Sequence, residues 1–182
     1  MSKKIIITGG LGYIGTELCK IYSGVSWNNK IVVIDNRFIS ERVNQIRNWN
    51  MDFVHGDILD KELIKKHFKD ADIVHHLAGI TDVPRTQNDS SDIKDKKIKE
   101  VAEKGTQNIL DTINNDCKII FPSTHVVYEG IDPIQTEISE NEKVKPILAY
   151  SSSKALNEKQ LKNSGKNYII LRLGSVYGYS TD

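Results

Sequence analysis

A tyrosine and a lysine four residues apart are the side chains of this sequence best suited to moving a proton. Tyr150 and Lys154 stand at the two ends of the run Tyr-Ser-Ser-Ser-Lys, and residues four apart lie on one face of a helix. An ammonium group beside a phenol favours the phenolate. We therefore expect Lys154 to lower the pKa of Tyr150 toward neutrality, which would make the phenol a general acid and base. The alternative is an ordinary pair on the surface of a lysine-rich helix.

A hydroxyl pair lies upstream of this tyrosine, where an apolar run ends. Ser123 and Thr124 follow the run from Lys118 to Phe121 and precede two valines. The hydroxyl of Thr124 could hydrogen-bond a substrate oxygen while Tyr150 moves its proton. Serine and threonine at strand ends are also common turn formers, so the pair has a purely structural alternative.

Three glycines separate the first expected strand from the first expected helix. Gly9, Gly12 and Gly15 fall in Thr-Gly-Gly-Leu-Gly-Tyr-Ile-Gly. The first would permit a tight turn, the second would let the backbone approach a pyrophosphate, and the third would let helix and strand pack closely. The phosphates would then face the free amides at the start of the helix.

Two acids follow the next apolar runs. Asp35 ends the run from Lys30, twenty residues beyond Gly15, where a carboxylate can accept hydrogen bonds from an adenosine ribose. A carboxylate there repels a 2′-phosphate and favours NAD over NADP, although Arg37 is close enough to weaken this preference. Asp57 could accept from an adenine amino group while Ile58 packs on the ring. Strand-end or helix capping is the alternative for both acids.

Strands and helices alternate along the chain. The expected strands are apolar throughout instead of alternating with polar residues, which indicates a parallel sheet with helices on both faces. Strands are expected at 3–8, 30–35, 52–55, 72–77, 118–121 and 168–173, and helices at 13–22, 61–68, 93–113 and 150–161. Polar loops are expected at 81–92, which holds Pro84, and at 129–146. The fold class is therefore a doubly wound α/β sheet of the Rossmann type, forming one domain over residues 1–182.

The overall composition excludes several classes of function. The chain has 25 basic and 24 acidic residues, for a net charge of +1, which argues against a broad surface for nucleic acid or an anionic membrane. Cys19 and Cys117 have no partner at metal-ligand spacing and are expected to be small buried hydrophobes. His75 and His76 point to opposite faces of a strand and cannot bind one metal together, so no metal site is expected. The short apolar start is no signal sequence, and a cytoplasmic protein is the default.

Taken in order, these motifs resemble one protein family over essentially the whole chain. The series T-G-G-L-G-Y-I-G, V-I-D-N, G-D-I, H-H-L-A-G, G-T-Q-N-I-L, P-S-T-H-V-V-Y, T-E, Y-S-S-S-K and L-R-L-G-S-V-Y-G resembles the extended short-chain dehydrogenase/reductases, which include NAD-dependent sugar-nucleotide epimerases and dehydratases. The resemblance implies a pyrophosphate site at Gly9, Gly12, Tyr13 and Ile14, a ribose site at Asp35 and Asn36, an adenine site at Asp57 and Ile58, a crevice lined by Leu77, Ala78 and Gly79, and a catalytic set of Thr124, Tyr150 and Lys154. Tyr150 and Lys154 would also contact the cofactor, and His76 matches a histidine whose family role is structural.

Three departures from the family pattern limit the choice of substrate. The family's dehydratases carry Asp-Glu where this chain has His125 and Val126, so dehydration is disfavoured, and we expect His125 to face the neighbouring loop rather than act as an acid or base. Ala102 replaces an asparagine of the family pattern. Gly174 and Ser175 stand where the family has Phe-Asn, and that asparagine commonly helps to hold the substrate.

The resemblance implies an enzyme acting on a nucleotide-activated sugar, most simply an epimerase with transient hydride transfer to NAD. The segment 123–130 also resembles dehydrorhamnose reductases, so a one-way NAD(P)H-dependent reductase is an alternative. A dinucleotide-binding sensor without turnover is a third possibility, because fold alone does not determine function. The family's smaller substrate-binding portion is largely absent before Asp182, and we expect the sequence to be a fragment of a longer enzyme. A homodimer through the long helices is also typical of the family.

Overall fold

The computed structural model describes residues 2–25, 28–81, 91–133 and 137–178. Pro84 and most of the loop predicted at 81–92 lie outside the described residues. The described strands form one sheet of six in the order β3-β2-β1-β4-β5-β6, and every neighbouring pair is parallel. Their bounds are β1 (Lys4–Thr8), β2 (Lys30–Asp35), β3 (Asp52–His55), β4 (Ile73–His76), β5 (Lys118–Thr124) and β6 (Asn167–Leu173). This order, with helices on the two faces, is the doubly wound Rossmann arrangement, so the predicted fold class is confirmed.

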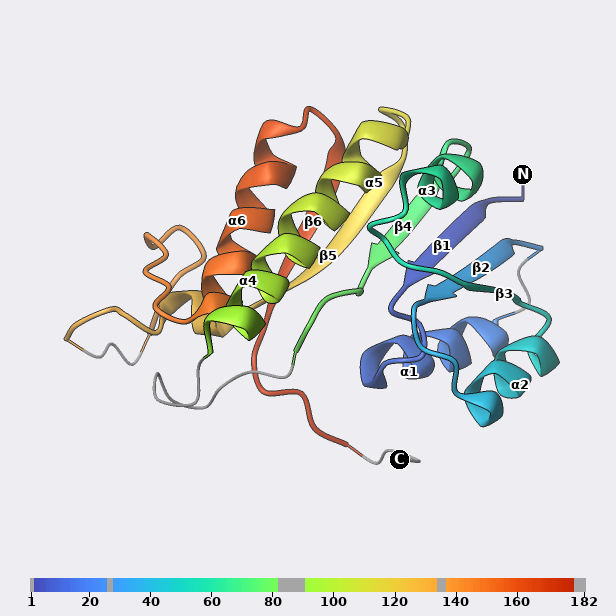
Figure 1. Cartoon of the computed structure of the whole chain (residues 1–182), viewed down its shortest axis with the longest axis horizontal. Coiled ribbons are helices and arrows are strands. Elements are labelled where there is room, and N and C mark those ends of the chain that lie inside the picture. The colour runs from blue at the N-terminus through green and yellow to red at the C-terminus, as the bar shows by residue number, and fades with distance from the viewer. Residues whose placement is uncertain (1, 26–27, 82–90, 134–136, 179–182) are drawn as a thin grey trace.

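Helices cover the two faces of the sheet unequally (Figure 1). The helical segments are α1 (Tyr13–Ser23), α2 (Ser40–Asn48), α3 (Lys61–Phe68), α4 (Asp92–Glu100), a π-helix (Val101–Gly105), α5 (Thr106–Thr112), a 3-10 helix (His125–Tyr128) and α6 (Ala149–Asn163). On one face, α1 and α2 pack over the first strands through a core that contains Ile7, Val33 and Ile46. On the other face, α3, α5 and α6 share a longer core that includes Val74 and Ile119.

The sequence prediction missed three local features. Helix α2 was not predicted because its outward face is polar, and its buried side chains are only Arg42, Val43 and Ile46. The long helix predicted at 93–113 is interrupted by the π-helix. The 3-10 helix begins directly after β5 and is capped by the hydroxyl of Thr124, which accepts from the Val126 amide. The predicted loop at 129–146 contains no helix or strand among its described residues.

Two further features of the described residues bear on function. No helix in this part of the chain is both long enough and apolar enough to cross a membrane. The same residues contain no group of three or more histidine, cysteine or acidic side chains placed to hold a metal ion. Cys19 and Cys117 are both buried, and burial raises the pKa of their thiols to about 12 and about 11.

Candidate active site

The glycine loop between β1 and α1 packs directly against the segment that follows β4. Gly9 has a φ of +66°, which favours glycine, and its amide donates to the carbonyl of Ile34 at 2.8 Å. A Cβ atom at Gly9 would lie only 2.8 Å from the amide nitrogen of Ala78 and 2.9 Å from the carbonyl carbon of Leu77. The loop therefore lies beside the predicted crevice residues, and only glycine fits at this contact.

The start of α1 is suited to an anion. Gly12 is the N-cap residue, no described side chain caps this end, and the first turn holds no acid. The first amides of a helix lack partners within the helix, and its dipole favours negative charge there. Gly15 is buried, and a Cβ atom there would overlap the carbonyl oxygen of Gly9. Tyr13 and Ile14 form the first turn, and the side chain of Ile14 is exposed.

Asp35 at the end of β2 is tied to the glycine loop. Its Oδ2 accepts from the Leu11 amide at 2.9 Å, and its Oδ1 accepts from the Arg37 amide at 2.9 Å. The carbonyl of Leu11 in turn accepts from the guanidinium of Arg42, which is buried in α2. Sequence reasoning missed Arg42, because an arginine in a polar stretch reads as a solvated surface residue. Both oxygens of Asp35 thus accept from backbone amides, which is the capping alternative for this residue.

The predicted adenine-side residues divide into a surface pair and a buried side chain. Asn36 donates its amide to Asp57 Oδ2 at 3.0 Å, so the ends of β2 and β3 meet. Asp57 Oδ1 also accepts from the Leu59 amide at 2.9 Å. Ile58 is only 5% exposed and packs against Gly105, where a Cβ atom would overlap its side chain. Its side chain thus belongs to the core rather than to an open surface.

Tyr150 and Lys154 lie in the first turns of α6, beside the end of β5. The ammonium of Lys154 donates to the carbonyl of Pro122 at 2.8 Å and lies 4.5 Å from the ring centre of Phe121. Its distance to the ring centre of Tyr150 is 5.9 Å. Pro122 precedes Thr124 by two residues, so this contact brings the tyrosine's helix and the threonine's strand end together. The structure therefore sets Lys154 against β5, with Tyr150 at the start of α6 and Thr124 at the end of β5, both at the carboxyl edge of the sheet.

The expected lowering of the tyrosine pKa is wrong for this arrangement. Burial raises the pKa of Tyr150 above its ordinary value of 10.0. Burial also lowers the pKa of Lys154 to about 8, because desolvation disfavours a charged form. The ammonium is engaged by the Pro122 carbonyl instead of the phenol, and burial alone accounts for the raised pKa of Tyr150.

The two hydroxyls at the end of β5 point to opposite faces of the sheet. Ser123 donates to Glu158 Oε1 at 2.6 Å, and this glutamate also holds Arg172 of β6. The burial of Glu158 raises its pKa, but the hydrogen bonds from Arg172 and Ser123 outweigh this effect and hold the pKa below its usual range. Alternation along the strand therefore turns the Thr124 side chain away from the α6 face, and its hydroxyl accepts from the Val126 amide at 3.2 Å.

A buried chain of hydrogen bonds joins Thr8, at the end of β1, to α6 through His76. Its Nδ1 lies 3.0 Å from the hydroxyl of Thr8, and its Nε2 lies 3.0 Å from the hydroxyl of Thr106. Asn157 of α6 donates to the same Thr106 hydroxyl at 2.9 Å and to the carbonyl of Ala102, in the π-helix, at 2.8 Å. Burial, aided by the charge of Lys154, lowers the pKa of His76 to about 3, so the imidazole is neutral and structural.

His75 faces the opposite side of the sheet, as predicted. Its Nε2 lies 2.8 Å from the hydroxyl of Tyr22 in α1, and burial lowers its pKa to about 4. His125 Nδ1 donates to the carbonyl of Leu173 at 3.1 Å. The His125 side chain borders a hollow of about 520 Å³ that is also lined by Ile138 and Glu140 of the following loop. His125 therefore faces this loop, as expected.

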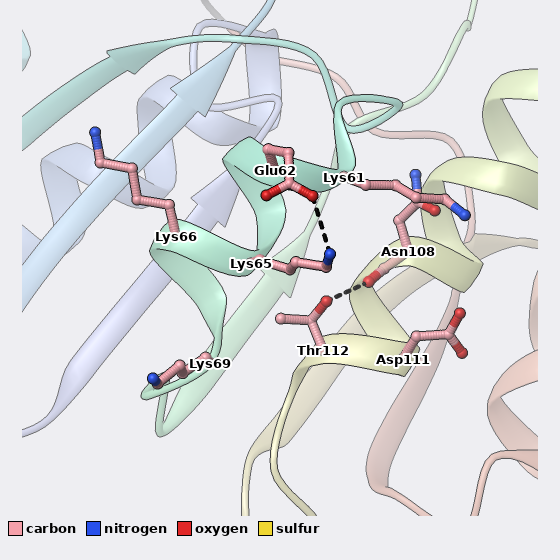
Figure 2. A pocket seen from close by; sticks show the side chains of 8 residues that line it. All are labelled: Lys61, Glu62, Lys65, Lys66, Lys69, Asn108, Asp111 and Thr112. Atoms are coloured by element: carbon pink, nitrogen blue, oxygen red, sulfur yellow. Dashed lines mark hydrogen bonds and ion pairs between the residues drawn. The ribbon is translucent and has the colours of Figure 1, made fainter.

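A hollow of about 760 Å³ lies between α3 and α5, away from these motifs. Its lining includes four lysines, but Lys65 is paired with Glu62 at 2.9 Å. Figure 2 shows Lys66 and Lys69 pointing away from Asn108 on the facing helix. The groove thus carries mixed charge and receives no side chain from the predicted site.

Comparison with known proteins agrees with the geometry. A family model described as "NAD dependent epimerase/dehydratase family" matches residues 5–182. A dTDP-D-glucose 4,6-dehydratase of Dictyostelium discoideum is 34% identical over 97% of this chain and 44% of its own length. The UDP-glucose 4-epimerase of Brucella ovis, solved in complex with NAD, is 28% identical, with a TM-score of 0.74 over 94% of this chain and 51% of that one.

A UDP-N-acetylglucosamine 4-epimerase of Methanobrevibacter ruminantium gives a TM-score of 0.75 at 29% identity, over 94% of this chain and 54% of that one. The chain thus spans about half the length of the relatives it matches. Because the family model covers nearly every residue, the chain belongs to the NAD-dependent epimerase/dehydratase family.

Proposed function

We propose that this chain is the dinucleotide-binding and catalytic half of an NAD-dependent enzyme that epimerises a nucleotide-activated sugar. The observation that carries the proposal is the meeting of α6 with the end of β5, where Lys154 binds the Pro122 carbonyl at 2.8 Å. We infer from this contact that Tyr150 and Thr124 act together at one edge of the sheet. The relatives named above support both the cofactor and the class of substrate.

The residues present fit a dinucleotide. The positive φ of Gly9 and the uncapped, acid-free start of α1 provide amides for a pyrophosphate at Gly9, Gly12, Tyr13 and Ile14. Asp35 and Asn36 would bind the adenosine ribose. Asp57 and the backbone at Ile58 would meet the adenine, and Leu77, Ala78 and Gly79 would line the crevice toward the nicotinamide. When bound, NAD would supply a hydride acceptor.

The chain's own residues would then handle the proton. Tyr150 would take the proton of a sugar hydroxyl while the carbon that bears this hydroxyl gives up a hydride to NAD. After the keto sugar has turned, the hydride would return to its other face and Tyr150 would return the proton to the keto oxygen. The Thr124 hydroxyl would hydrogen-bond this oxygen in both directions. Burial favours the protonated phenol, which suits the return step, while the forward step needs positive charge close to the ring.

One specific observation supports a second candidate. The segment 123–130, S-T-H-V-V-Y-E-G, resembles the dehydrorhamnose reductases, and its residues His125–Tyr128 form a 3-10 helix that contacts α6. A reductase would consume NADH or NADPH in proportion to product, whereas an epimerase regenerates NAD. A dinucleotide sensor would show neither change.

The test is to incubate the protein with NAD and UDP-, GDP- or dTDP-sugars and to follow the sugar protons by NMR. We expect one epimer pair to equilibrate without net accumulation of NADH. Tyr150→Phe should lower turnover about 100- to 10,000-fold, because it removes the acid/base. The Kd for NAD should stay within about twofold, which is well under 1 kcal/mol. Full function of Tyr150→Phe with intact NAD binding would instead support the sensor.

A homodimer through the long helices is proposed on the same footing. Helices α4 and α6 lie side by side with the π-helix between α4 and α5 (Figure 1), and they present one surface to a second copy. Sedimentation at increasing protein concentration tests this, and a single monomeric species throughout would contradict it.

A further inference from the structure

The catalytic helix α6 begins without a cap of its own. Its N-cap residue is Leu148, which has no side-chain acceptor, and the first turn contains no acid. Tyr150 is the second residue of this helix, so any fraying of the first turn would move the phenol. The first amides of a helix need outside partners. A group outside α6 must therefore hold this end of the helix.

Glu129, which lies 19 residues before Leu148 in the sequence, supplies that partner. Its Oε1 accepts from the amide of Ile147 at 2.6 Å and from the amide of Leu148 at 2.7 Å. The hydroxyl of Ser151, in the first turn, donates to the same oxygen. A carboxylate at a helix N-terminus is stabilised both by these amides and by the helix dipole. Glu129 therefore accepts from the amide of the N-cap residue itself, as the glutamate of a capping box does, and it holds the Ser151 hydroxyl of the first turn on the same oxygen.

The same glutamate is linked to the other catalytic side chain. It directly follows the 3-10 helix that Thr124 caps through the Val126 amide. Two backbone hydrogen bonds hold the two segments together, from Lys145 to the Val127 carbonyl at 2.8 Å and from Gly130 to the Lys145 carbonyl at 2.9 Å. Thr124 and Tyr150 are thus the outer ends of one hydrogen-bonded clamp with Glu129 at its centre.

The charges around Glu129 leave its carboxylate to the amides. Arg172, which borders the same hollow, is committed to Glu158 through a 2.6 Å ion pair, and His125 donates to the Leu173 carbonyl. Within the described part of the chain, no lysine, arginine or histidine forms a salt bridge with Glu129. The carboxylate is satisfied by the end of α6, not by a cation.

We propose that Glu129 is a positioning residue that fixes Tyr150 relative to Thr124 by capping the catalytic helix from the adjacent segment. The inference rests on the proposed function for its catalytic consequence, but the clamp itself does not. Glu129 would touch neither substrate nor cofactor. Its removal should loosen the geometry of the acid/base without emptying the dinucleotide site.

The experiment compares Glu129→Ala and Glu129→Gln with a matched control, Glu142→Ala. Glu142 lies in the same connection and is exposed, and among the described residues its carboxylate accepts only from the amide of its neighbour Lys143, at 3.3 Å. Glu129→Ala should lower kcat about 10- to 100-fold, the range expected when a reacting group is misplaced by about an ångström. The KM and the Kd for NAD should change less than about threefold, which is below 1 kcal/mol.

The glutamine variant keeps an acceptor of the same shape and loses the charge. It should therefore fall between the wild type and Glu129→Ala, with kcat lowered about two- to fivefold, and it keeps the test decisive if the alanine variant does not fold. Hydrogen exchange should show faster exchange at the amides of Ile147 and Leu148 in Glu129→Ala and no change there in Glu142→Ala. A kcat of Glu129→Ala equal to that of Glu142→Ala would overturn the proposal. So would equal losses in kcat, KM and NAD affinity.

A readout that needs no turnover separates this inference from the proposed function. Isotope-labelled tyrosine, assigned with Tyr150→Phe, reports the pKa of Tyr150 by NMR. Burial raises that pKa, so a loosened first turn should let it fall toward the ordinary value of 10.0 in Glu129→Ala but not in Glu142→Ala. If no sugar is turned over, the proposed function fails while this shift still supports the clamp. An unchanged pKa in Glu129→Ala would overturn the clamp whether or not the protein is active.

Discussion

The two halves of the sheet differ in how completely helices cover their faces. In the half that carries the dinucleotide loop, helices cover both faces, and Ile7 of β1 and Val33 of β2 are fully buried. In the half that carries Thr124, Tyr150 and Lys154, the described residues cover only the face toward α5 and α6. Ile169 and Leu171 of β6, which pair with Ile120 and Pro122 on the other face, are 40% and 43% exposed.

This difference shows how each half holds its functional groups. The dinucleotide loop is fixed by packing, because Gly9 touches the backbone after β4 and Asp35 and Arg42 fasten Leu11 from two sides. The catalytic half relies on individual polar ties, such as Lys154 to the Pro122 carbonyl and Glu129 to the start of α6. We therefore expect substitutions in the first half to act through steric fit and those in the second to act through single hydrogen bonds.

The largest expected difference between the two modes of fixation comes from placing the same side chain at two glycines that share a positive φ. Gly9 has a φ of +66° and Gly165, in the turn before β6, has +68°. A Cβ at Gly9 would lie 2.8 Å from the Ala78 amide, whereas one at Gly165 meets nothing within 4 Å. Gly9→Ala should cost about 4 kcal/mol or more of unfolding free energy and abolish NAD binding. Gly165→Ala should cost only about 1 kcal/mol, the price of the backbone conformation.

Thermal or urea unfolding, together with titration by NADH fluorescence, measures both variants. Equal losses at the two glycines would mean that backbone strain alone sets the cost. The packing argument for the dinucleotide loop would then be wrong.

These glycines also mark how far the sequence could predict the site. The spacing of Gly9, Gly12 and Gly15 predicted the loop, because a turn that backs onto another chain segment needs residues without Cβ atoms, and such residues are visible in the sequence. Most of the strands were predicted for a similar reason, since a strand buried on both faces is largely apolar.

The parts that sequence reasoning missed depend on contacts between distant segments. Arg42 is buried because it reaches the Leu11 carbonyl, and nothing in its neighbours along the chain indicates that partner. The cap that Glu129 provides for α6 is of the same kind. The pKa of Tyr150 was predicted in the wrong direction, because the balance between burial and the charge of Lys154 depends on distances that spacing does not give.

Truncation of one apolar side chain in each half gives the next largest effect. Ile7→Ala removes a fully buried side chain from the core under α1 and should cost about 3 kcal/mol, since a cavity is left behind. Leu171→Ala shortens a side chain that is already 43% exposed and should cost about 1 kcal/mol or less. Urea unfolding of the two variants tests this. A loss at Leu171 as large as that at Ile7 would show that the face of β6 is covered in solution.

Lowering the pH should destabilise the fold through His75 and His76 of β4, the strand between the two halves of the sheet. Their folded pKa values, about 4 and about 3, are lowered from 6.5 by burial. Below pH 6.5 the unfolded chain therefore binds more protons than the folded chain, and stability is lost as the pH falls toward these values. At about 1.4 kcal/mol for each pKa unit, we expect a loss of at least about 2 kcal/mol between pH 6.5 and pH 4.

His75→Gln should reduce this acid loss, whereas the exposed His55, which contacts the Asn36 carbonyl, serves as the control through His55→Gln. Urea unfolding at several pH values gives the slope directly. A stability that does not change between pH 6.5 and pH 4 would mean that these histidines are not buried as neutral groups.

The smallest expected effect lies at the rim of the packed half, where Arg37 flanks Asp35. The guanidinium is about half exposed and 3.4 Å from the Asp35 carboxylate, and one of its nitrogens would lie 3.7 Å from a Cβ at Gly12. A cation here can offset the repulsion between Asp35 and a 2′-phosphate. Because exposed ion pairs contribute less than about 1 kcal/mol, Arg37→Ala should weaken NADP binding about three- to fivefold and leave NAD binding within about twofold. Competition titrations with the two dinucleotides measure both constants. A loss of NAD affinity equal to that of NADP would place the guanidinium on the pyrophosphate instead, and the rim would then share the packing role that we assign to the loop beneath it.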